Sequence, residues 1–248
     1  MNIQLSVHKL SRHFGGLKAI DNVSLHLQSG ILHAVIGTNG AGKSTLINLI
    51  SGELAPSQGQ IILNEQDITL WSQPKRAKAG LGRSYQRTTL FDELSVYENC
   101  RLAAQAKQEQ FWHWCKSAAD CKQSKAFAEH ALSLAGLSSD AHLIAGTLSH
   151  GRKRQLEIAM SLATQPSVLL LDEPLAGMGP EESEHMLSLL NKLKQEHAIL
   201  LVEHDMDAVF KVADQITVMV NGQMLASGRP EAIRANPQVQ EAYLGETA

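Results

Sequence analysis

The segment GTNGAGKST, Gly37 to Thr45, constrains the fold more than any other part of the chain. It fits the pattern G-x-x-x-x-G-K-[ST], with the strand-like run HAVI before it and the helix-like run TLINLISG after it. Glycines at these positions let backbone N–H groups close around phosphate oxygens, and the N-terminus of the following helix favours anions. We therefore expect a core strand that leads through a phosphate loop directly into a helix.

Each residue of this phosphate loop is a candidate contact for a nucleotide. Lys43 is placed to reach the terminal phosphates, and the hydroxyl of Ser44 is placed to bind Mg²⁺. A glycine-rich turn without a ligand would need neither the strand before it nor the helix after it, so we predict a nucleotide site. Its candidate residues are Gly37, Thr38, Asn39, Gly40, Ala41, Gly42, Lys43, Ser44 and Thr45.

Two further apolar strands end in groups suited to phosphate chemistry. The run SVLLLDEP ends in Asp172, placed to hold Mg²⁺ through water, and Glu173, placed to polarise an attacking water. An acidic pair at a strand end is otherwise a common helix cap or turn, but beside a phosphate loop it favours hydrolysis of a nucleoside triphosphate. His204 follows the strand of AILLVEH at the end where α/β proteins bind ligands, so we predict a γ-phosphate contact rather than a structural role.

Strand-like and helix-like segments alternate along most of the chain. It opens with runs rich in β-forming residues, IQLSVHKL and VSLHLQSGILHAVIG, and after Ser149 apolar strands alternate with helices. Between about residues 90 and 137 the segments are long, Ala-rich and helical in pattern, which indicates a helical insertion. This order predicts an α/β fold with a mainly parallel sheet that is covered on both faces.

Composition narrows the class of protein. With 248 residues, 44% of them hydrophobic, the chain is long enough to bury a large core. Its net charge of −3 argues against a general polyanion binder, so no nucleic-acid partner is expected. The N-terminus lacks the apolar run of a signal peptide, and the longest apolar stretches have the length of strands, so we expect a soluble, cytosolic protein. The three cysteines, Cys100, Cys115 and Cys121, lack the paired spacing of a zinc site.

The stretch LSHGRKRQLEIA combines a serine, a histidine and three basic residues, and it fits three hypotheses: a nucleophile with its base, a nucleic-acid patch, or half of a shared site. A Ser149–His150 dyad is disfavoured because adjacent side chains on a helix point apart. The stretch predicts an amphipathic helix that begins at Ser149, whose hydroxyl and free N–H groups suit a phosphate. We expect Arg152, Lys153 and Arg154 on a solvated or phosphate-facing side.

In order along the chain, GTNGAGKST, RSYQ, LSHGRKRQ, VLLLDEP and VEHD resemble the motifs of the ATP-binding subunit of an ABC transporter. The segments SRHFGGLKAIDNVSL, GLGRSYQRTTLFDELSVYEN, DEPLAGMGPEES and the terminal AYLG resemble the ATPases of branched-chain (hydrophobic) amino-acid importers more closely. This resemblance implies a P-loop NTPase core with an N-terminal antiparallel β subdomain and an inserted α-helical subdomain. It also implies ATP and Mg²⁺ as cofactors and hydrolysis of ATP coupled to transport across a membrane.

The resemblance assigns roles residue by residue. Phe14 matches an aromatic that stacks on adenine, although a phenylalanine at a strand end also fits a core position. Gln86 matches a glutamine that senses Mg²⁺ and the γ-phosphate. Ser149 and Gly151 match residues that close over the ATP of a second subunit. Of the three hypotheses for the LSHG segment, the resemblance therefore favours half of a shared site. The sequence departs from the family pattern at three positions, His150, Arg152 and Gly179.

The resemblance also implies an organisation and a set of partners. One ABC ATPase domain spans residues 1–248, with its core in residues 1–87 and about 162–248, a helical subdomain in about 88–161, and a C-terminal helical tail in about 229–248. The expected partners are a second ABC ATPase subunit, integral membrane permease subunits and, indirectly, a substrate-binding protein. The expected location is peripheral, on the cytoplasmic face of the inner membrane.

Other functions remain open at this stage. Related importers for urea or other amides share much of the same sequence. A soluble ABC ATPase that acts on nucleic acid or ribosomes usually carries two cassettes or a long coiled-coil insertion, whereas this chain has one cassette and no sustained heptads. A small P-loop kinase or GTPase would leave the LSHG segment and His204 unexplained.

The segment after Gln86 enters the helical insertion and is a candidate for coupling to the permease. Its apolar residues Leu90 and Phe91 are expected either to pack in the helical subdomain or to line a groove for a short permease helix. Trp112 and Trp114 lie within the predicted helical insertion. They are expected either to pack inside that insertion or to form a docking surface for another protein.

Overall fold

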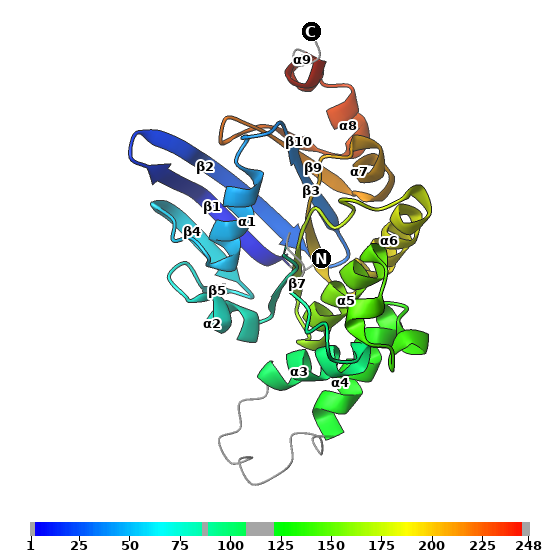
Figure 1. Ribbon diagram of the computed structural model, residues 1–248. Helices are drawn as coiled ribbons and strands as arrows, with labels where there is room; N and C mark the ends of the chain where they lie inside the picture. The colour runs from blue at the N-terminus through cyan, green and yellow to red at the C-terminus, as the bar shows by residue number, and fades with distance from the viewer. Residues whose placement is uncertain (1–2, 86–88, 108–121, 245–248) are drawn as a thin grey trace.

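The computed structural model describes residues 3–85, 89–107 and 122–244, and two β-sheets organise this part of the chain (Figure 1). The smaller sheet is antiparallel, with the order β2-β1-β4-β5. Its strands are β1 (Ile3–Phe14), β2 (Leu17–Gln28), β4 (Gln58–Leu63) and β5 (Gln66–Asp67). The turn between β4 and β5 is made by Asn64 and Glu65, both with positive φ.

The larger sheet has six strands in the order β10-β9-β3-β8-β7-β6. All neighbouring pairs are parallel except β9 with β10, which form an antiparallel hairpin. Its strands are β3 (Leu32–Gly37), β6 (Leu81–Arg83), β7 (Val168–Asp172), β8 (Ala198–Val202), β9 (Gln215–Val220) and β10 (Gln223–Gly228). Because β3, β7 and β8 lie side by side and run in the same direction, their C-terminal ends meet at one edge of the sheet.

One face of the larger sheet packs against helix α1 (Lys43–Ser51), which lies between the two sheets (Figure 1). Leu46, Leu49 and Ile50 of this helix belong to one buried cluster with side chains from the antiparallel sheet and with Val35 and Leu170 of the larger sheet. The helix ends at Gly52, which adopts the left-handed conformation common after a helix terminus.

The opposite face of the larger sheet carries a layer of helices. Alternate residues of the strands, such as Ala34, Leu171 and Leu201, belong to a second buried cluster that includes residues of every helix in this layer. The helices are α3 (Val96–Lys107), α4 (Lys122–Leu134), α5 (His150–Ala163), α6 (Pro180–Leu193) and α7 (Met206–Val212). Burial of both faces explains why these strands are apolar throughout rather than alternating.

The predicted fold class is confirmed: a mainly parallel core sheet, an antiparallel sheet at the N-terminus and a set of helices. Helices α3, α4 and α5 pack against one another at one end of the molecule. The predicted boundaries of the helical subdomain and of the tail remain predictions. The sequence patterns did not predict α2 (Gln73–Lys78) or β6, since a segment of three to six residues is too short to show a period.

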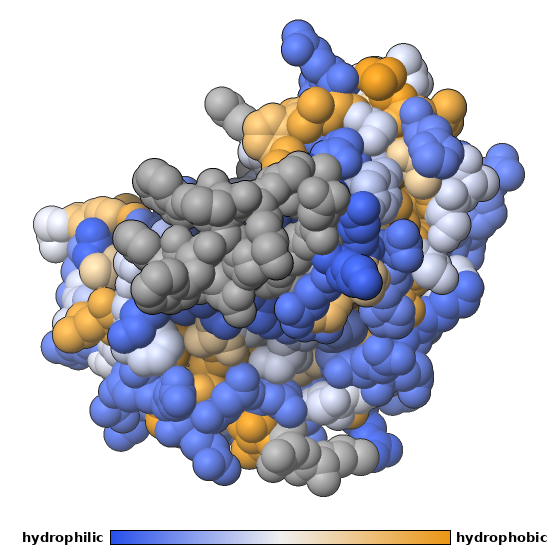
Figure 2. All heavy atoms as spheres, turned by 90° about the horizontal axis from the view of Figure 1, so that it is seen from below, coloured by the Kyte–Doolittle hydropathy of each residue, from blue (hydrophilic) through white to orange (hydrophobic). Residues whose placement is uncertain are grey.

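The remaining short elements lie on the outside of this framework. Two 3₁₀ turns connect α4 to α5, and two helices follow β10 at the C-terminal end (Figure 1). Their bounds are η3 (Ser138–Asp140), η4 (Ala145–Thr147), α8 (Pro230–Arg234) and α9 (Pro237–Leu244). Seen from the end that carries α3 and α4, the described surface is mainly hydrophilic with smaller hydrophobic areas (Figure 2). Within the described ranges no helix is both long enough and apolar enough to cross a membrane.

Candidate functional site

The phosphate loop leaves the buried strand β3 at Gly37 and enters α1 at Lys43. Gly42, the residue before the helix, has a φ of 98°, and a Cβ atom there would lie 2.7 Å from the carbonyl oxygen of Ala19. Only glycine fits this combination of left-handed backbone and close approach. The N–H groups in the first turn of α1 have no partner within the helix. Because the bend at Gly42 carries no side chain, these N–H groups stay accessible to a ligand.

Lys43 folds back over this loop. Its Nζ donates hydrogen bonds to the carbonyl oxygens of Gly37 at 2.6 Å and Thr38 at 3.0 Å, and the residue is 8% exposed. Burial lowers the pKa of Lys43, while the charges of Glu173 and Asp172 act in the opposite direction. The ammonium group thus lies within the electrostatic reach of both carboxylates that the sequence singled out.

A groove of about 790 Å³ runs along the phosphate loop, which is the size of a site for a small organic ligand. Glu173 and the turn at Asn221 and Gly222 line it, together with Lys18 and Phe14 beside the loop itself. Phe14 is 44% exposed, so it is not a core residue and the packing alternative does not hold. The guanidinium carbon of Arg12 lies 4.6 Å from the centre of the Phe14 ring, leaving an aromatic surface at the rim of the groove.

Asp172 and Glu173 stand at the end of β7, next to the phosphate loop. Asp172 is 4% exposed, and burial raises the pKa of its carboxyl, while the positive charge of Arg83 acts in the opposite direction. Glu173 has a φ of 49°, a sparsely populated conformation for a residue with a side chain. Its N–H donates to the carbonyl oxygen of Val202 at 2.9 Å, which fixes the turn to the neighbouring strand β8.

His204 lies close to Glu173, as its position after β8 predicted. The distance from His204 Nδ1 to Glu173 Oε1 is 3.8 Å, and the histidine side chain is 62% exposed. The residue before it, Glu203, is completely buried and accepts hydrogen bonds from the N–H of Leu175 at 2.9 Å and of His204 at 3.2 Å. Glu203 therefore joins the loop after Glu173 to the strand end that carries His204.

Burial of Glu203 could not be predicted from the sequence, because an acidic residue at a strand end is normally exposed. Burial raises the pKa of its carboxyl, and the two backbone hydrogen bonds act in the opposite direction. The available signal was its position directly between an apolar strand and His204 in AILLVEH.

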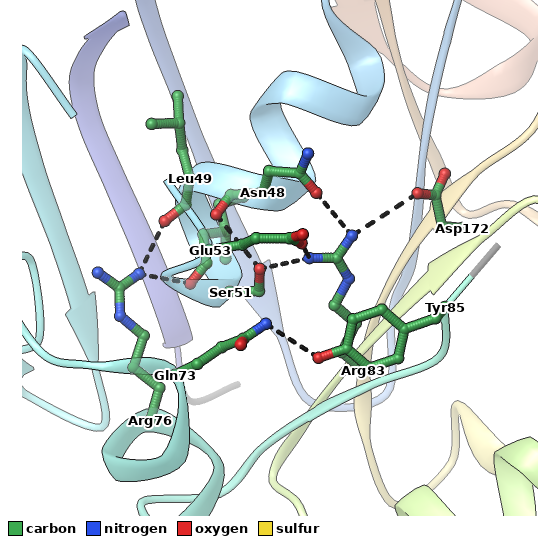
Figure 3. A network of polar contacts seen from close by, with 10 residues as sticks. Asn48, Leu49, Ser51, Glu53, Gln73, Arg76, Arg83, Tyr85 and Asp172 are labelled. Atoms are coloured by element: carbon green, nitrogen blue, oxygen red, sulfur yellow. Dashed lines mark hydrogen bonds and ion pairs between the residues drawn. The ribbon is translucent and has the colours of Figure 1, made fainter. Parts of the chain in front are cut away.

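Arg83 forms a second set of contacts that the sequence did not reveal (Figure 3). Its Nη1 donates to Ser51 Oγ at 2.6 Å and to Glu53 Oε2 at 2.7 Å, and its Nη2 donates to Asn48 Oδ1 at 2.6 Å. The same Nη2 lies 3.9 Å from Asp172 Oδ2. The strand β6 thereby connects the C-terminal half of α1 to the carboxylate at the end of β7.

Arg76 holds the same end of α1 from the other side (Figure 3). It is 1% exposed, and its Nη1 donates to the carbonyl oxygens of Leu49 at 2.8 Å and Ile50 at 2.6 Å. Its other nitrogens donate to the carbonyl oxygens of Thr69 and Trp71. The buried guanidinium group thus satisfies carbonyl groups that a helix terminus leaves free. It holds the C-terminal end of α1 in place, at the opposite end of the helix from the phosphate loop.

Ser149 caps the N-terminus of α5, as predicted, and its Oγ accepts a hydrogen bond from the N–H of Arg152 at 3.3 Å. The hydroxyl donates to Glu182 Oε1 at 3.0 Å. Neither Ser149 nor Gly151 is among the described residues that line the groove at the phosphate loop. Within one chain, the structure therefore does not bring Ser149 and the phosphate loop together.

The departures from the family pattern make contacts of their own. His150 Nε2 lies 3.0 Å from the carbonyl oxygen of Ala176, in the loop after Glu173. Arg152 Nη1 donates to the carbonyl oxygen of Gly136 at 3.1 Å. Gly179 precedes α6 and, having no side chain, offers no side-chain cap to that helix.

The prediction that Arg154 lies on a solvated or phosphate-facing side is wrong. Arg154 is 6% exposed, and its Nη1 donates to the carbonyl oxygen of Tyr85 at 2.7 Å and to Glu157 Oε2 at 2.9 Å. Three basic residues in a row occupy different directions around a helix, so one of them points inward, where Glu157 and a backbone carbonyl compensate its charge.

A second groove, of about 250 Å³, lies between α2, β6 and α5. It is lined in part by Gln73, Arg83, Tyr85, Thr89 and Met160. Leu90 and Phe91, which we expected to line a groove, are not among its described lining residues. Leu90 packs against the helical core, whereas Phe91 is 56% exposed.

Several residues from the sequence analysis lie outside the described ranges, namely Gln86, Trp112, Trp114, Cys115 and Cys121. The remaining cysteine, Cys100, is a buried free thiol, and burial raises its pKa to about 12. This thiol is therefore a packing residue and not a reactive group.

Comparison with known proteins confirms the resemblance. A family model described as "ABC transporter" matches residues 20–176, and one described as "Branched-chain amino acid ATP-binding cassette transporter" matches residues 223–248. The chain is 41% identical to the high-affinity branched-chain amino acid transport ATP-binding protein LivG of Salmonella typhimurium, over 98% of each protein. It is 39% identical to the corresponding protein BraF of Pseudomonas aeruginosa, again over 98% of each.

Solved structures agree with this assignment. The ADP conformation of MJ1267, an ATP-binding cassette of an ABC transporter, superimposes with a TM-score of 0.87 and 30% sequence identity, covering 99% of this chain and 100% of that one. A nucleotide-free ATP-binding cassette from an ABC transporter gives a TM-score of 0.85 at 29% identity, covering 98% and 99%. The chain belongs to the ABC transporter family, in which it is an ATP-hydrolysing subunit of an importer.

Proposed function

We propose that this ATPase powers the import of branched-chain or other hydrophobic amino acids through a membrane permease. The observation that carries the proposal is the 41% identity, over 98% of both chains, to a protein named for branched-chain amino acid transport. The match of residues 223–248 to the branched-chain family model supports it from the C-terminal end. The urea and amide importers considered above become outcomes of the transport assay.

In this proposal ATP occupies the groove at the phosphate loop. Phe14 stacks on adenine, residues 37–45 surround the phosphates, and Lys43 exchanges its two loop carbonyls for phosphate oxygens. Ser44, Asp172 and Gln86 would hold Mg²⁺, for which a hydroxyl and a carboxylate are suitable hard oxygen donors. When bound, the ion would supply positive charge that stabilises the developing charge on the phosphates.

Glu173 and His204 perform the hydrolytic step. Glu173 orients and polarises the attacking water, and its carboxylate lies beside the groove, within reach of the charge on Lys43. His204, whose Nδ1 is 3.8 Å from Glu173 Oε1, contacts the γ-phosphate. Glu203 supports both residues, because its two oxygens accept hydrogen bonds from the N–H of Leu175, two residues after Glu173, and from the N–H of His204 itself.

Two ATPase subunits form the complete site. Ser149 and Gly151 at the start of α5 bind the γ-phosphate held by the partner, which is either a second copy or a related ATPase. Support comes from the free N–H groups and favourable potential at the N-terminus of α5, and from the absence of both residues from the described lining of this chain's own groove.

The permease is proposed to dock on the face that carries the groove between α2, β6 and α5, placing the subunit peripherally on the cytoplasmic side of the membrane. Support comes from the lining of this groove, which combines polar residues such as Gln73 and Thr89 with the apolar Met160. A mixed lining of this kind suits a short amphipathic segment of a permease. A substrate-binding protein delivers the amino acid to the permease and does not contact this subunit.

The test combines hydrolysis with transport. Glu173→Gln should retain ATP binding and lose turnover by about 10²-fold or more, as expected when a general base is removed. The matched control is Glu196→Gln, an exposed glutamate beyond α6, which should hydrolyse ATP at the wild-type rate. In vesicles that contain the assembled transporter, the wild-type chain should drive ATP-dependent uptake of leucine, isoleucine and valine. Wild-type turnover by Glu173→Gln would refute the catalytic assignment, and uptake of urea in place of the amino acids would refute the cargo.

A further inference from the structure

The hydroxyl of Ser149 has a single proton, and in this structure that proton is already used. Ser149 Oγ accepts from the N–H of Arg152 and donates to Glu182 Oε1 at 3.0 Å. A serine that binds a phosphate oxygen must donate its O–H to that oxygen, since an anionic phosphate is an acceptor. The hydroxyl cannot donate to Glu182 and to a phosphate at the same time.

Glu182 also covers the neighbouring glycine. A Cβ atom at Gly151 would lie 2.6 Å from Glu182 Cδ and 2.7 Å from Glu182 Oε1. No side chain fits between the two, so the carboxylate lies directly against the backbone at the start of α5. It covers the same pair of residues, Ser149 and Gly151, that the proposed function assigns to the partner's nucleotide.

The location suits a negative charge. Glu182 is the third residue of α6, in the first turn after Pro180, and its carboxylate reaches the first turn of α5. Free N–H groups at helix N-termini stabilise anions by their hydrogen bonds and by the helix dipole. The carboxylate therefore takes the place at α5 that a phosphate would take, with the same kind of charge.

We propose that Glu182 is a positioning residue that withholds the Ser149 hydroxyl and the start of α5 from the partner's nucleotide until the two subunits close. This inference rests on the proposed two-subunit site. In the resting subunit the carboxylate satisfies Ser149 and neutralises the attraction of the α5 N-terminus for other anions. When the subunits close over ATP, the γ-phosphate displaces the Glu182 carboxylate. A phosphate oxygen then accepts the hydrogen bond that the Ser149 hydroxyl had donated to Glu182. Closure therefore includes the cost of breaking one charge-assisted hydrogen bond.

The experiment measures closure in the assembled transporter, which contains the full chain. A distance probe on each ATPase subunit reports closure while a non-hydrolysable ATP analogue is titrated. Glu182→Gln removes the charge and keeps one acceptor oxygen, and Glu182→Ala removes both. Glu181→Gln is the matched control, since it changes the net charge equally at an exposed position one residue earlier on the same helix.

We expect half-maximal closure at a roughly ten-fold lower analogue concentration in Glu182→Ala, with a smaller shift in Glu182→Gln, because a charge-assisted bond no longer has to break. Glu181→Gln should stay close to the wild type. Analogue binding by the isolated chain should be unchanged in all three. Glu182→Ala should melt slightly lower than the wild type, because the resting chain loses the hydrogen bond to Ser149. A merely structural role of Glu182 would make closure harder in these variants, not easier.

A separate variant distinguishes failure of this inference from failure of the proposed function. Ser149→Arg should prevent closure if the shared site is assigned correctly. If Ser149→Arg prevents closure and the Glu182 variants close like the wild type, or less readily, Glu182 does not withhold the hydroxyl and the inference is overturned. If Ser149→Arg closes normally, the two-subunit site is wrong, and the inference falls with it.

Discussion

Glu203 offers a quantitative test of how the site is held together, because each of its carboxylate oxygens serves one backbone donor. Oε1 accepts from the N–H of Leu175 at 2.9 Å, and Oε2 accepts from the N–H of His204 at 3.2 Å, in a residue with no exposed surface. Glu203→Gln has almost the same shape but only one oxygen, so one of the two N–H groups must face an amide NH₂. Glu203→Ala leaves both N–H groups without an acceptor.

The expected magnitudes follow from these contacts. An unsatisfied buried N–H group costs about 1–3 kcal/mol. Burial raises the pKa of Glu203, which means that its charge is itself unfavourable there, so the neutral glutamine regains part of the loss. We therefore expect Glu203→Gln to lower the free energy of unfolding by about 1 kcal/mol, or roughly 2–4 °C in melting temperature for a chain of this size, and Glu203→Ala by about 3 kcal/mol.

The effect on hydrolysis should exceed the effect on stability. The glutamine must release either the loop after Glu173 or the strand end that carries His204, and a displacement of about 1 Å in an active site can cost on the order of 10²-fold in rate. The assay pairs thermal unfolding with steady-state ATP hydrolysis, with Glu196→Gln as the exposed control. If Glu203→Gln hydrolyses ATP at the wild-type rate and melts at the same temperature, the two hydrogen bonds do not position the site.

Two further predictions concern the core strand β3 and the segment before α3. Burial lowers the pKa of His33, whose Nε2 lies 2.8 Å from Thr217 Oγ1, to about 4 from 6.5. In the unfolded chain the His33 imidazole is protonated below about pH 6.5, whereas in the folded chain it stays neutral down to about pH 4. Stability should therefore fall by about 3 kcal/mol over that window as the pH drops, and equal slopes of unfolding free energy against pH in wild type and His33→Gln would contradict this. Phe91→Ala should leave melting temperature and basal hydrolysis nearly unchanged, because the side chain is 56% exposed and buried Asn99 bonds both backbone groups of Phe91. Phe91 does not line the groove between α2, β6 and α5, but its exposed ring is a candidate permease contact beside the helical subdomain, so permease pull-down and uptake should weaken. Unchanged assembly would show that docking does not extend to Phe91.

The local elements of the site could be predicted from the sequence because each depends on neighbours along the chain. The phosphate loop needs glycine at a bend with positive φ, such as Gly42, and a strand and a helix on either side. Apolar strands that end in Asp172 and in His204 could be recognised because parallel strands buried on both faces are apolar throughout. Ser149 at the start of α5 followed from helix capping, another interaction within a few residues.

The contacts that support the site could not be predicted in this way, because their partners lie far apart in the chain. Arg83 bonds Asn48 and Ser51, more than thirty residues earlier, and Glu203 at the end of β8 bonds the N–H of Leu175, which follows the neighbouring strand β7. Charged residues are normally exposed, so sequence patterns place them on the surface by default. Arg76, Arg154 and Glu203 are buried instead, and whether a charge is buried depends on acceptors and donors that only the folded chain assembles around it.

The sequence by itself therefore determined the class of fold and predicted a nucleotide site with its candidate catalytic residues, since glycine conformation, strand burial and helix capping act over short distances. Only the tertiary structure decided how α1 is held by two arginines, how Glu203 joins Glu173 to His204, and that Glu182 covers Ser149. These contacts arise where separate elements pack, and their energy depends on distances and burial that no local pattern encodes.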